Sequence, residues 1–577
     1  MSITRIQSLA ASLLLATTLS ACGSDSTSTN PTTSTSTTIN GQAIAGAVNG
    51  TLHVHDASDV HFATATITDG QFSVEIPNDK LSGALDFEVT GTYRDEVSGQ
   101  TVTLTATNPL ALHVAANHYR AGQLGNAPIT PDTSIIRTMV SNGMTITAAE
   151  TAFQTAFGYK PDLTAAPFDP YTTQSITTQT MADQTAAFRV GVWSQLGADL
   201  GLTASDLAEL PIKLAADLAD GTLNGVDSLG NPVTFTSSGV NLQALNQAVP
   251  LANRLSMAVS GFAGSPANIA GVAAPSMGLP PISADMPGTT KTITLGNGTR
   301  QINVKIDTPA TTPFQMGYRN VKTTHKITLT DAATFSPVNI NTDANINNIS
   351  FKPWMYMFAG HQHGSPFASI DTTQAASGIY TVDTYYLMPT GMMMGTEVVP
   401  MGQWDLEIKL GDNTAAAADP YAYSHFFPNV MMNMGTDLLL AKGINANDAW
   451  TDMMGVTKPR EYRVWLQNVV ANAGGGHDFT VYVTTLGMKM GVGMIFPPVH
   501  AGLMMPAITT VVCEVSTNGG TTWQVMPAGA INGQYSITGL AGLNNAAQST
   551  LDIRLTVNGN VMETAAAGNL QLKFTAP

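Results

Sequence analysis

The spacing of apolar residues changes twice along the chain, and these changes predict two β-rich regions around one helical region. Between residues 41 and 121, apolar and polar residues alternate with a period of two, which is typical of strands with one buried face. Between residues 130 and 260, apolar residues recur three and four positions apart, which indicates amphipathic helices. The alternation returns after residue 288. The predicted fold class is therefore a multidomain, mainly β protein with β-sandwich domains and one α-helical domain.

Turn residues predict two hairpins in the first β region. Asp-Gly and Ser-Gly pairs between alternating segments favour tight turns, because glycine accepts the backbone conformation that such turns need. Asp69-Gly70 joins Thr64–Thr68 to Phe72–Ile76, and Ser98-Gly99 joins Phe87–Tyr93 to Thr101–Thr107.

Capping residues predict the helix ends in the second region. Thr147 and Glu150 have the spacing of a capping box, and Gly158 is placed to end that helix. Further helices are predicted at Met181–Leu200 and Ala204–Leu218, the latter with Thr203 as its N-cap.

Changes in composition divide the chain into eight segments. A stretch rich in proline and glycine marks a linker before the last β region, and the turn "STNGGTTW" before a strand is typical of an immunoglobulin-like sandwich. The predicted segments are a signal peptide at 1–21, a Ser/Thr-rich tether at 22–40, a Greek-key β-sandwich at 41–121, an α-helical domain at 130–260, a linker at 261–288, a β-sandwich at 289–412, a methionine-rich connection at 413–457 and an immunoglobulin-like β-sandwich at 458–577.

The N-terminus predicts export and attachment to a membrane. Arg5 precedes an uncharged stretch that is too short to be a permanent transmembrane helix. The following residues, Leu19-Ser20-Ala21-Cys22, resemble the lipobox of bacterial lipoproteins, which implies that Cys22 carries the lipid after cleavage. Gly23 in the next position resembles outer-membrane lipoproteins. We therefore expect a lipid-anchored protein of the bacterial cell envelope, at the outer rather than the inner membrane.

Composition excludes several classes of function. The net charge of −16 excludes a nucleic-acid partner, because phosphate binding needs a basic surface. Two cysteines exclude a disulfide scaffold, and Cys513 lies in an apolar strand where burial is expected. The common hydrolase, metalloprotease and nucleotide-binding motifs are absent, so the chain is not expected to be an enzyme.

Methionine is concentrated in one part of the chain. Seventeen of the 27 methionines lie between Met355 and Met505, many of them two residues apart. Residues two apart share one face of a strand, so such pairs can present two thioethers together. Thioether sulfur selects Cu(I), and imidazole also binds copper. The candidate copper ligands are Met355, Met357, His361, His363, Met392, Met394, Met401, His425, Met432 and Met434.

Two segments resemble known families. The order of His361-x-His363, "SGIYTVDTYYLM" and "PMGQWDLEIKL" resembles the FixH/YtkA-like domain, an extracytoplasmic sandwich associated with copper handling and cytochrome oxidase assembly. The segment "DGQFSVEIP" resembles small Greek-key domains of the carboxypeptidase-regulatory-like type. The first resemblance implies a role in copper sequestration or delivery, with a copper protein as partner.

Two alternatives remain open. Methionine is also a flexible core filler, so the alternative to a copper protein is a scaffold or binding lipoprotein whose methionines only pack. In the first β region, His53 and His55 share a strand face, and His61, His113 and His118 occur nearby. No ligand spacing links these histidines, so surface histidines are expected there rather than a metal site.

Overall fold

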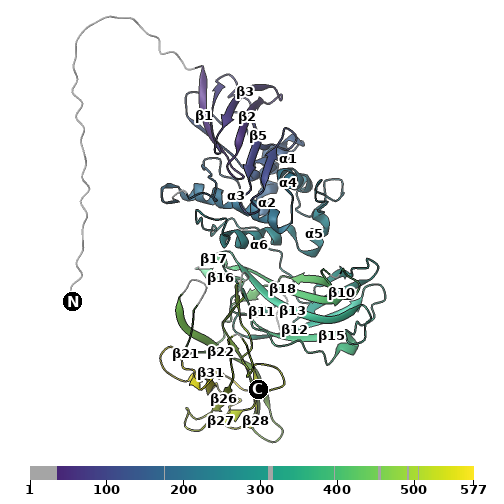
Figure 1. The fold of residues 1–577 in the computed structure, drawn as a ribbon, viewed down its shortest axis with the longest axis vertical. Coiled ribbons are helices and arrows are strands. Elements are labelled where there is room, and N and C mark those ends of the chain that lie inside the picture. The colour runs from purple at the N-terminus through teal and green to yellow at the C-terminus, as the bar shows by residue number, and fades with distance from the viewer. Residues whose placement is uncertain are drawn as a thin grey trace, which may run out of the picture.

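The computed structural model describes residues 35–173, 176–308, 316–394, 397–416, 418–451, 456–489, 493–504 and 506–577. The predicted signal peptide, the lipidation residue Cys22 and most of the tether lie outside these residues. Two small sheets and the helices lie at one end of the molecule, and two sandwiches follow toward the C-terminus (Figure 1). This arrangement confirms a multidomain, mainly β fold with one helical part.

The N-terminal part contains two sheets. The first has the order β4-β1-β8, and the second has the order β3-β2-β5-β6 with β7 beside β5. Strand β1 begins at Ser36, within the segment predicted to be a tether, because Ile39 and other alternate residues are buried. The strands are β1 (Ser36–Ala43), β2 (Asn49–Asp56), β3 (His61–Ile67), β4 (Gln71–Pro77), β5 (Leu85–Arg94), β6 (Thr101–Leu104), β7 (Leu110–Val114) and β8 (Gly125–Ile129).

Only one of the two predicted hairpins is a ladder of paired strands. β5 and β6 pair antiparallel as predicted. β3 and β4 are joined by the predicted tight turn, with positive φ angles at Asp69 and Gly70, but they share only the bridge between Thr68 and Gln71. β3 then pairs with β2 and β4 with β1, so the hairpin prediction was wrong. The turn passes the chain from one sheet to the other.

In the described part of the chain, six α-helices follow. They are α1 (Pro131–Ser141), α2 (Ile146–Phe157), α3 (Met181–Asp199), α4 (Ala204–Asp217), α5 (Leu242–Ala248) and α6 (Leu251–Ala263). Helix α1 contacts β7 and β8, and α4 contacts β6. The predicted caps at Gly158 and Thr203 are confirmed. The predicted cap at Thr147 was wrong, because the Thr145 hydroxyl accepts from the Ala148 N–H and α2 begins two residues earlier.

Strands and helices of the N-terminal part share one hydrophobic core. The core extends from Ile39 in β1 to Phe262 in α6 and includes Val272 from the predicted linker. α6 also contacts β13 and β18 of the next module, whose Phe358 belongs to the same core. The two N-terminal segments predicted as separate domains therefore pack as one unit.

The second module is a sandwich of a four-stranded sheet, β15-β12-β10-β9, and a six-stranded sheet, β19-β18-β13-β14-β25-β24. Its core contains Trp404, Tyr386 and Met355. The strands from β9 to β20 are β9 (Thr290–Thr294), β10 (Gln301–Asp307), β11 (Gly317–Tyr318), β12 (Lys322–Asp331), β13 (Ile346–Met357), β14 (Gln362–Gly364), β15 (Ile379–Tyr385), β16 (Gly391–Met394), β17 (Glu397–Pro400), β18 (Gly402–Asp412), β19 (Tyr421–Phe426) and β20 (Val430–Met431).

The third module pairs the sheet β21-β22-β23-β28 with the sheet β27-β26-β29-β30, to which β31 adds beside β29. Cys513 is buried in its core, as predicted. The remaining strands are β21 (Leu440–Thr451), β22 (Thr457–Ala471), β23 (His477–Thr485), β24 (Gly487–Lys489), β25 (Gly493–Ile495), β26 (Val511–Ser516), β27 (Gln524–Met526), β28 (Gln534–Leu540), β29 (Ser549–Val557), β30 (Asn560–Val561) and β31 (Leu570–Phe574).

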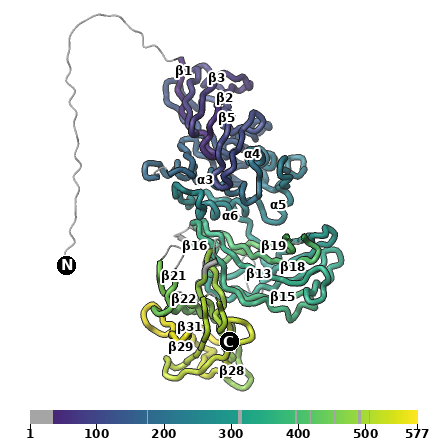
Figure 2. Tube along the Cα trace, in the orientation of Figure 1, coloured from purple at the N-terminus to yellow at the C-terminus, as the bar shows by residue number. Residues whose placement is uncertain are grey.

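The second and third modules are joined by more than the chain between them. Strands β24 and β25 follow β23 in sequence but extend the second module's sheet at β14. Tyr385 of the second module stacks on Tyr482 of the third, with ring centroids 5.2 Å apart. The predicted connection at 413–457 holds β19, which pairs with β18, and β21, which pairs with β22. Figure 2 shows the second and third modules side by side, in agreement with these contacts.

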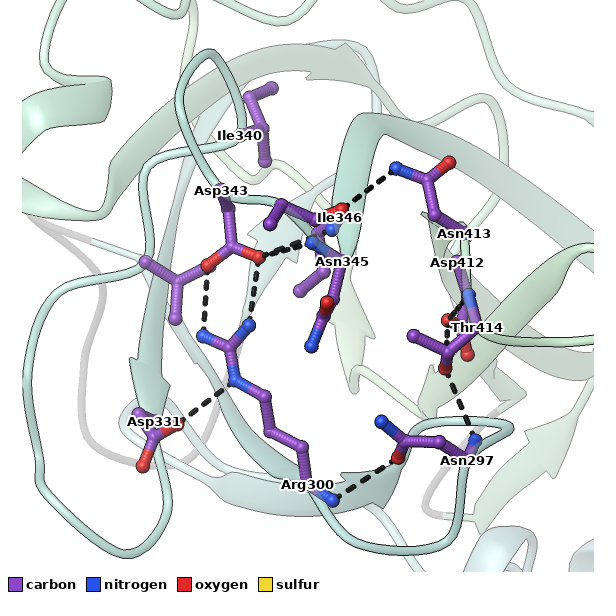
Figure 3. A network of polar contacts seen from close by, with 12 residues as sticks. Asn297, Arg300, Asp331, Ile340, Asp343, Asn345, Ile346, Asp412, Asn413 and Thr414 are labelled. Atoms are coloured by element: carbon purple, nitrogen blue, oxygen red, sulfur yellow. Dashed lines mark hydrogen bonds and ion pairs between the residues drawn. The ribbon is translucent and has the colours of Figure 1, made fainter.

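A charged network closes one end of the second module (Figure 3). Arg300 makes two parallel hydrogen bonds to Asp343, at 2.7 and 2.8 Å, and a third to Asp331 at 3.0 Å. On the neighbouring strand end, Asp412 accepts from Thr414. The guanidinium therefore ties Asp331 and Asp343 together into a structural network.

Within the described ranges, none of the helices has the length and apolar character needed to cross a membrane.

Candidate metal centre

Four residues form one row across the six-stranded sheet of the second module. Met355 in β13 pairs with Trp404 in β18 on one side and with His363 in β14 on the other. His363 pairs in turn with Met494 in β25. Residues paired in this way point to the same face of a sheet, with Cβ atoms about 4.5–5.5 Å apart in antiparallel pairs. The sheet therefore places a methionine on the strand on each side of His363, on the same face.

One ring nitrogen of His363 is hydrogen-bonded, and the other has no hydrogen-bond partner among the described residues. Its Nδ1 lies 2.9 Å from the Gly364 carbonyl oxygen, which can only accept, so Nδ1 carries the hydrogen and donates it. Nε2 then holds a lone pair, and this buried atom has no hydrogen-bond partner among the described residues. The side chain is only 3% exposed. An N–H fixed by a carbonyl and an open second nitrogen are typical of metal-binding histidines.

Burial also keeps this imidazole neutral. Loss of hydration is the largest cause of the lowered pKa of His363, and the charge of Arg463 lowers it further, against an opposing effect of the Gly364 carbonyl. A neutral imidazole is the form that binds a metal ion. At neutral pH the Nε2 lone pair is therefore available.

The Trp404 ring closes the row at its inner end. The His363 and Trp404 rings lie 5.4 Å apart and are nearly perpendicular, although their strands flank β13 on opposite sides. The two rings therefore meet over Met355, which is fully buried. Met494 is only half-buried, so it is the most exposed member of the row.

Two other predicted ligands lie at the edge of the same core. Met357 and Met401 are partly buried against it. Met357 shares the face of Met355 because it lies two residues further along β13, whereas Met401 precedes β18. Met357 lies two residues after Met355, and Met401 lies three residues before Trp404. Neither is a strand partner of His363.

Histidines 361 and 425 lie away from the row. His361 is exposed in the turn between β13 and β14. His425 in β19 pairs with Glu407 and holds Asp405 through Nδ1 at 3.0 Å, on the face opposite to Trp404. Burial lowers the pKa of His425, but the Asp405 hydrogen bond and charge outweigh that effect and raise it. This histidine is an ion-pair partner and cannot join His363.

The remaining predicted methionines do not converge on the row. Met432 lies beside a cation, since its Sδ is 3.9 Å from Arg319 Nη1, and Met434 is 89% exposed. Met392 is half-buried in β16, which pairs with β17 rather than with the six-stranded sheet. The side chain of Met394 lies outside the described residues. Ten predicted ligands thus reduce to two, Met355 and His363, with Met357 and Met401 at the margin.

Sequence reasoning did not select Met494. The segment "GMKMGVGM" at 487–494 has the same methionine spacing as the chosen segments, so a signal was present. The parallel pairing of His363 with Met494 joins residues that are 131 positions apart, which no local pattern reveals.

The chemistry of this row is that of a soft cation site. In the described part of the chain, no group of three or more His, Cys, Asp or Glu side chains is arranged to hold a metal. Any ion bound here would therefore depend on sulfur together with one imidazole. Neutral thioethers and a neutral imidazole suit Cu(I) rather than Zn(II), Ca(II) or Mg(II).

A separate cavity of about 590 Å³ lies between the second and third modules. It is lined by Lys352, Trp354, Phe367, Tyr482, Phe496 and Asn532, among others. Trp354 and Gly364 each alternate with a member of the row, so the cavity lies on the other face of the sheet. Its apolar walls with a few polar groups are typical of a small-molecule pocket.

Comparisons with known proteins do not assign this chain to a family. No family model matches it, and no curated protein matches it. One similar solved structure is described as a Ca2+-stabilized adhesin that helps an Antarctic bacterium reach out and bind ice. It is 10% identical over 93% of this chain and 97% of that chain, with a TM-score of 0.11.

Proposed function

We propose that this protein is a lipid-anchored, non-catalytic protein of the bacterial cell envelope that binds Cu(I) for sequestration or delivery. The observation that carries the proposal is the buried His363 Nε2, which lacks a hydrogen-bond partner among the described residues and belongs to a residue whose strand partners are Met355 and Met494. Leaving such an atom unpaired costs about 1–3 kcal/mol. A bound ion would remove that cost.

The arrangement favours exchange over permanent storage. Met494 is half-buried, whereas Met355 is fully buried beneath the two rings. Met494, His363 and Met355 would hold the Cu(I) ion, with Met494 on the more exposed side and Met355 on the buried side. Thiols are oxidised outside the cytoplasm, so thioether ligands suit the compartment that the lipobox predicts. A copper protein is the expected partner.

The test is a titration of the full chain with Cu(I), in oxygen-free reducing buffer, against a colorimetric Cu(I) chelator. We expect a single high-affinity Cu(I) per chain. His363→Asn, and Met355→Leu combined with Met494→Leu, should each weaken affinity by at least about tenfold. Met434→Leu is the matched control, because it removes an exposed thioether and should change nothing.

Two results would reject the proposal: less than one bound Cu(I) per chain, or equal affinity in the wild type and both site variants. The alternative function would then be a binding or scaffolding lipoprotein whose methionines pack. The cavity at Trp354 and Tyr482 favours this alternative, since an apolar or aromatic molecule fits its walls. It predicts that Trp354→Ala weakens ligand binding while the three methionine-to-leucine changes do not.

A further inference from the structure

Three histidines gather at an edge of the N-terminal sheet, far along the chain from the row at His363. His53 and His55 are two residues apart in β2 and therefore share a face. His61 begins the edge strand β3 and pairs with His55. Its ring centroid lies 5.5 Å from that of His53 and 5.4 Å from that of His55. β3 has a neighbour only on its β2 side, so this edge is open.

These ring spacings match those of histidines on one metal ion. With a metal–nitrogen distance of about 2.0–2.1 Å and tetrahedral angles, two ligating imidazole rings have centroids roughly 5 Å apart. The nitrogens do not yet face a common point, since none of the described groups of three is already arranged to hold a metal. His61 is exposed, and its Nε2 lies 2.9 Å from the Thr64 hydroxyl, so binding through this nitrogen would replace that contact.

A carboxylate already orients one of the three imidazoles. His55 Nδ1 lies 3.1 Å from an Asp59 carboxylate oxygen, which leaves His55 Nε2 directed away from that contact. The same acid–imidazole pairing fixes the ring and raises ligand basicity at known metal sites. Asp59 itself has a positive φ of 60°, so the turn holds a strained residue at this position.

Acidic residues lie on the strand next to these histidines. On the adjacent strand β5, Glu88 pairs with His53 and Asp86 pairs with His55. Asp86 also accepts from His113 Nδ1 at 3.0 Å and lies near Arg137, which itself bonds Glu88. Carboxylates therefore lie on the strand beside His53 and His55, where both already contact Arg137.

We propose that His53, His55 and His61 bind one divalent transition-metal ion of borderline softness, Cu(II) or Zn(II), at the open edge of the N-terminal sheet. Imidazole ligands without sulfur suit these ions, whereas thioethers select Cu(I). The site therefore differs from the row at His363 in both ligand type and oxidation state. It does not rest on the proposed Cu(I) function, and either site can fail alone.

The test uses the untagged full chain with Cu(II) as the probe, in buffer containing glycine as a weak competing ligand. We expect one Cu(II) per chain and an electron paramagnetic resonance spectrum with splitting from several imidazole nitrogens. His55→Asn combined with His61→Asn should weaken binding by at least about tenfold and remove that splitting. Zn(II) should displace the Cu(II) signal in the wild type.

Three controls keep the outcome decisive. His118→Asn removes an exposed histidine of the same β region and should leave binding unchanged. His363→Asn should also leave Cu(II) binding unchanged, which separates this site from the proposed Cu(I) site. His61→Asn alone changes an exposed residue at a strand end and tests the site in a chain that folds. Equal binding by the wild type and the double variant, or equal losses in the double variant and His118→Asn, would overturn the proposal.

Discussion

The imidazole of His363 meets the indole of Trp404 edge-on, with ring centroids 5.4 Å apart and planes inclined by 78°. The two residues sit on β14 and β18, and β13 runs between those strands. The rings can approach so closely only because each leans over Met355. Met355, His363 and Trp404 are therefore close neighbours in the core. A change of charge at the His363 nitrogen should alter the electrostatic surroundings of the Trp404 ring.

Tryptophan fluorescence should therefore report Cu(I) at His363. A cation at Nε2 alters the electrostatic surroundings of the nearby indole, and we expect emission to fall as Cu(I) is added. The chain has six tryptophans, so the informative quantity is the difference between the wild type and His363→Asn. An equal fall in both proteins would place the responding metal away from His363.

Substitution of Met355 should separate its packing role from its metal role. Met355 is fully buried in the second core, so Met355→Ala should lower the free energy of unfolding by about 2–5 kcal/mol. Met355→Leu keeps the volume and should cost less than about 1.5 kcal/mol. Urea unfolding of both variants measures these values. If the leucine variant keeps its stability but loses Cu(I) affinity, sulfur rather than volume matters at this position.

The fold was predicted well where the relevant signal was local. Thr203 with Asp206 at one helix start, and Gly158 at a helix end, could be identified because each signal lies within one turn of helix. The same is true of the tight turn at Asp69-Gly70. The partners of the strands that this turn connects could not be predicted, because β1 and β2 compete for them from elsewhere in the chain.

The candidate site was predicted only in part for the same reason. Met355 and His363 were predicted as ligands because residues two positions apart in a strand share one face, and this pattern is visible in the sequence of β13 and β14. Met494 pairs with His363 because β25, which follows a strand of the third module, joins the sheet of the second module. No local pattern in the sequence indicates this pairing. His425 was misplaced because its strand register turns it to the other face, where Asp405 binds it.

A second buried histidine predicts a loss of stability in mild acid. His325 lies in the second core between Thr308 and Tyr386, and burial lowers its pKa to about 3 from an ordinary value of 6.5. Between those two pKa values the unfolded chain binds a proton at this residue and the folded chain does not. The free energy of unfolding should therefore fall as the pH drops below 6.5, by at most about 1.4 kcal/mol per pH unit.

The measurement compares the wild type with His325→Gln across this pH range. The glutamine side chain can still donate and accept hydrogen bonds but does not titrate, so its stability should depend less on pH. Carboxylates contribute equally to both proteins, and the difference between the two curves isolates His325. Parallel curves between pH 6.5 and 4 would show that His325 takes up its proton in the folded state.

Arg300 should stabilise the end of the second module through its geometry as well as its charge. It bonds Asp343 through two nitrogens and Asp331 through a third (Figure 3). Lysine keeps the charge but cannot form the double contact, so Arg300→Lys should already lower the free energy of unfolding by about 1–3 kcal/mol. Thermal unfolding in low and high salt measures this. Lys305→Arg, at a more exposed ion pair, is the control and should change little.

Tyr482 should decide whether the second and third modules unfold together. Its ring stacks on Tyr385, and its hydroxyl donates to the Phe367 carbonyl at 2.6 Å, so one side chain binds the second module in two ways. Tyr482→Phe keeps the stack and should cost about 1 kcal/mol, whereas Tyr482→Ala removes both contacts and should cost about 3–5 kcal/mol. Calorimetry should show one transition in the phenylalanine variant and two in the alanine variant, because the shared cluster with Trp465 then opens before either core.

The control is Tyr423→Phe, which loses a hydrogen bond to Asp419 at the protein surface and should leave a single transition. A single transition in Tyr482→Ala as well would mean that strands β24 and β25, which the third module adds to the second module's sheet, are enough to couple the two.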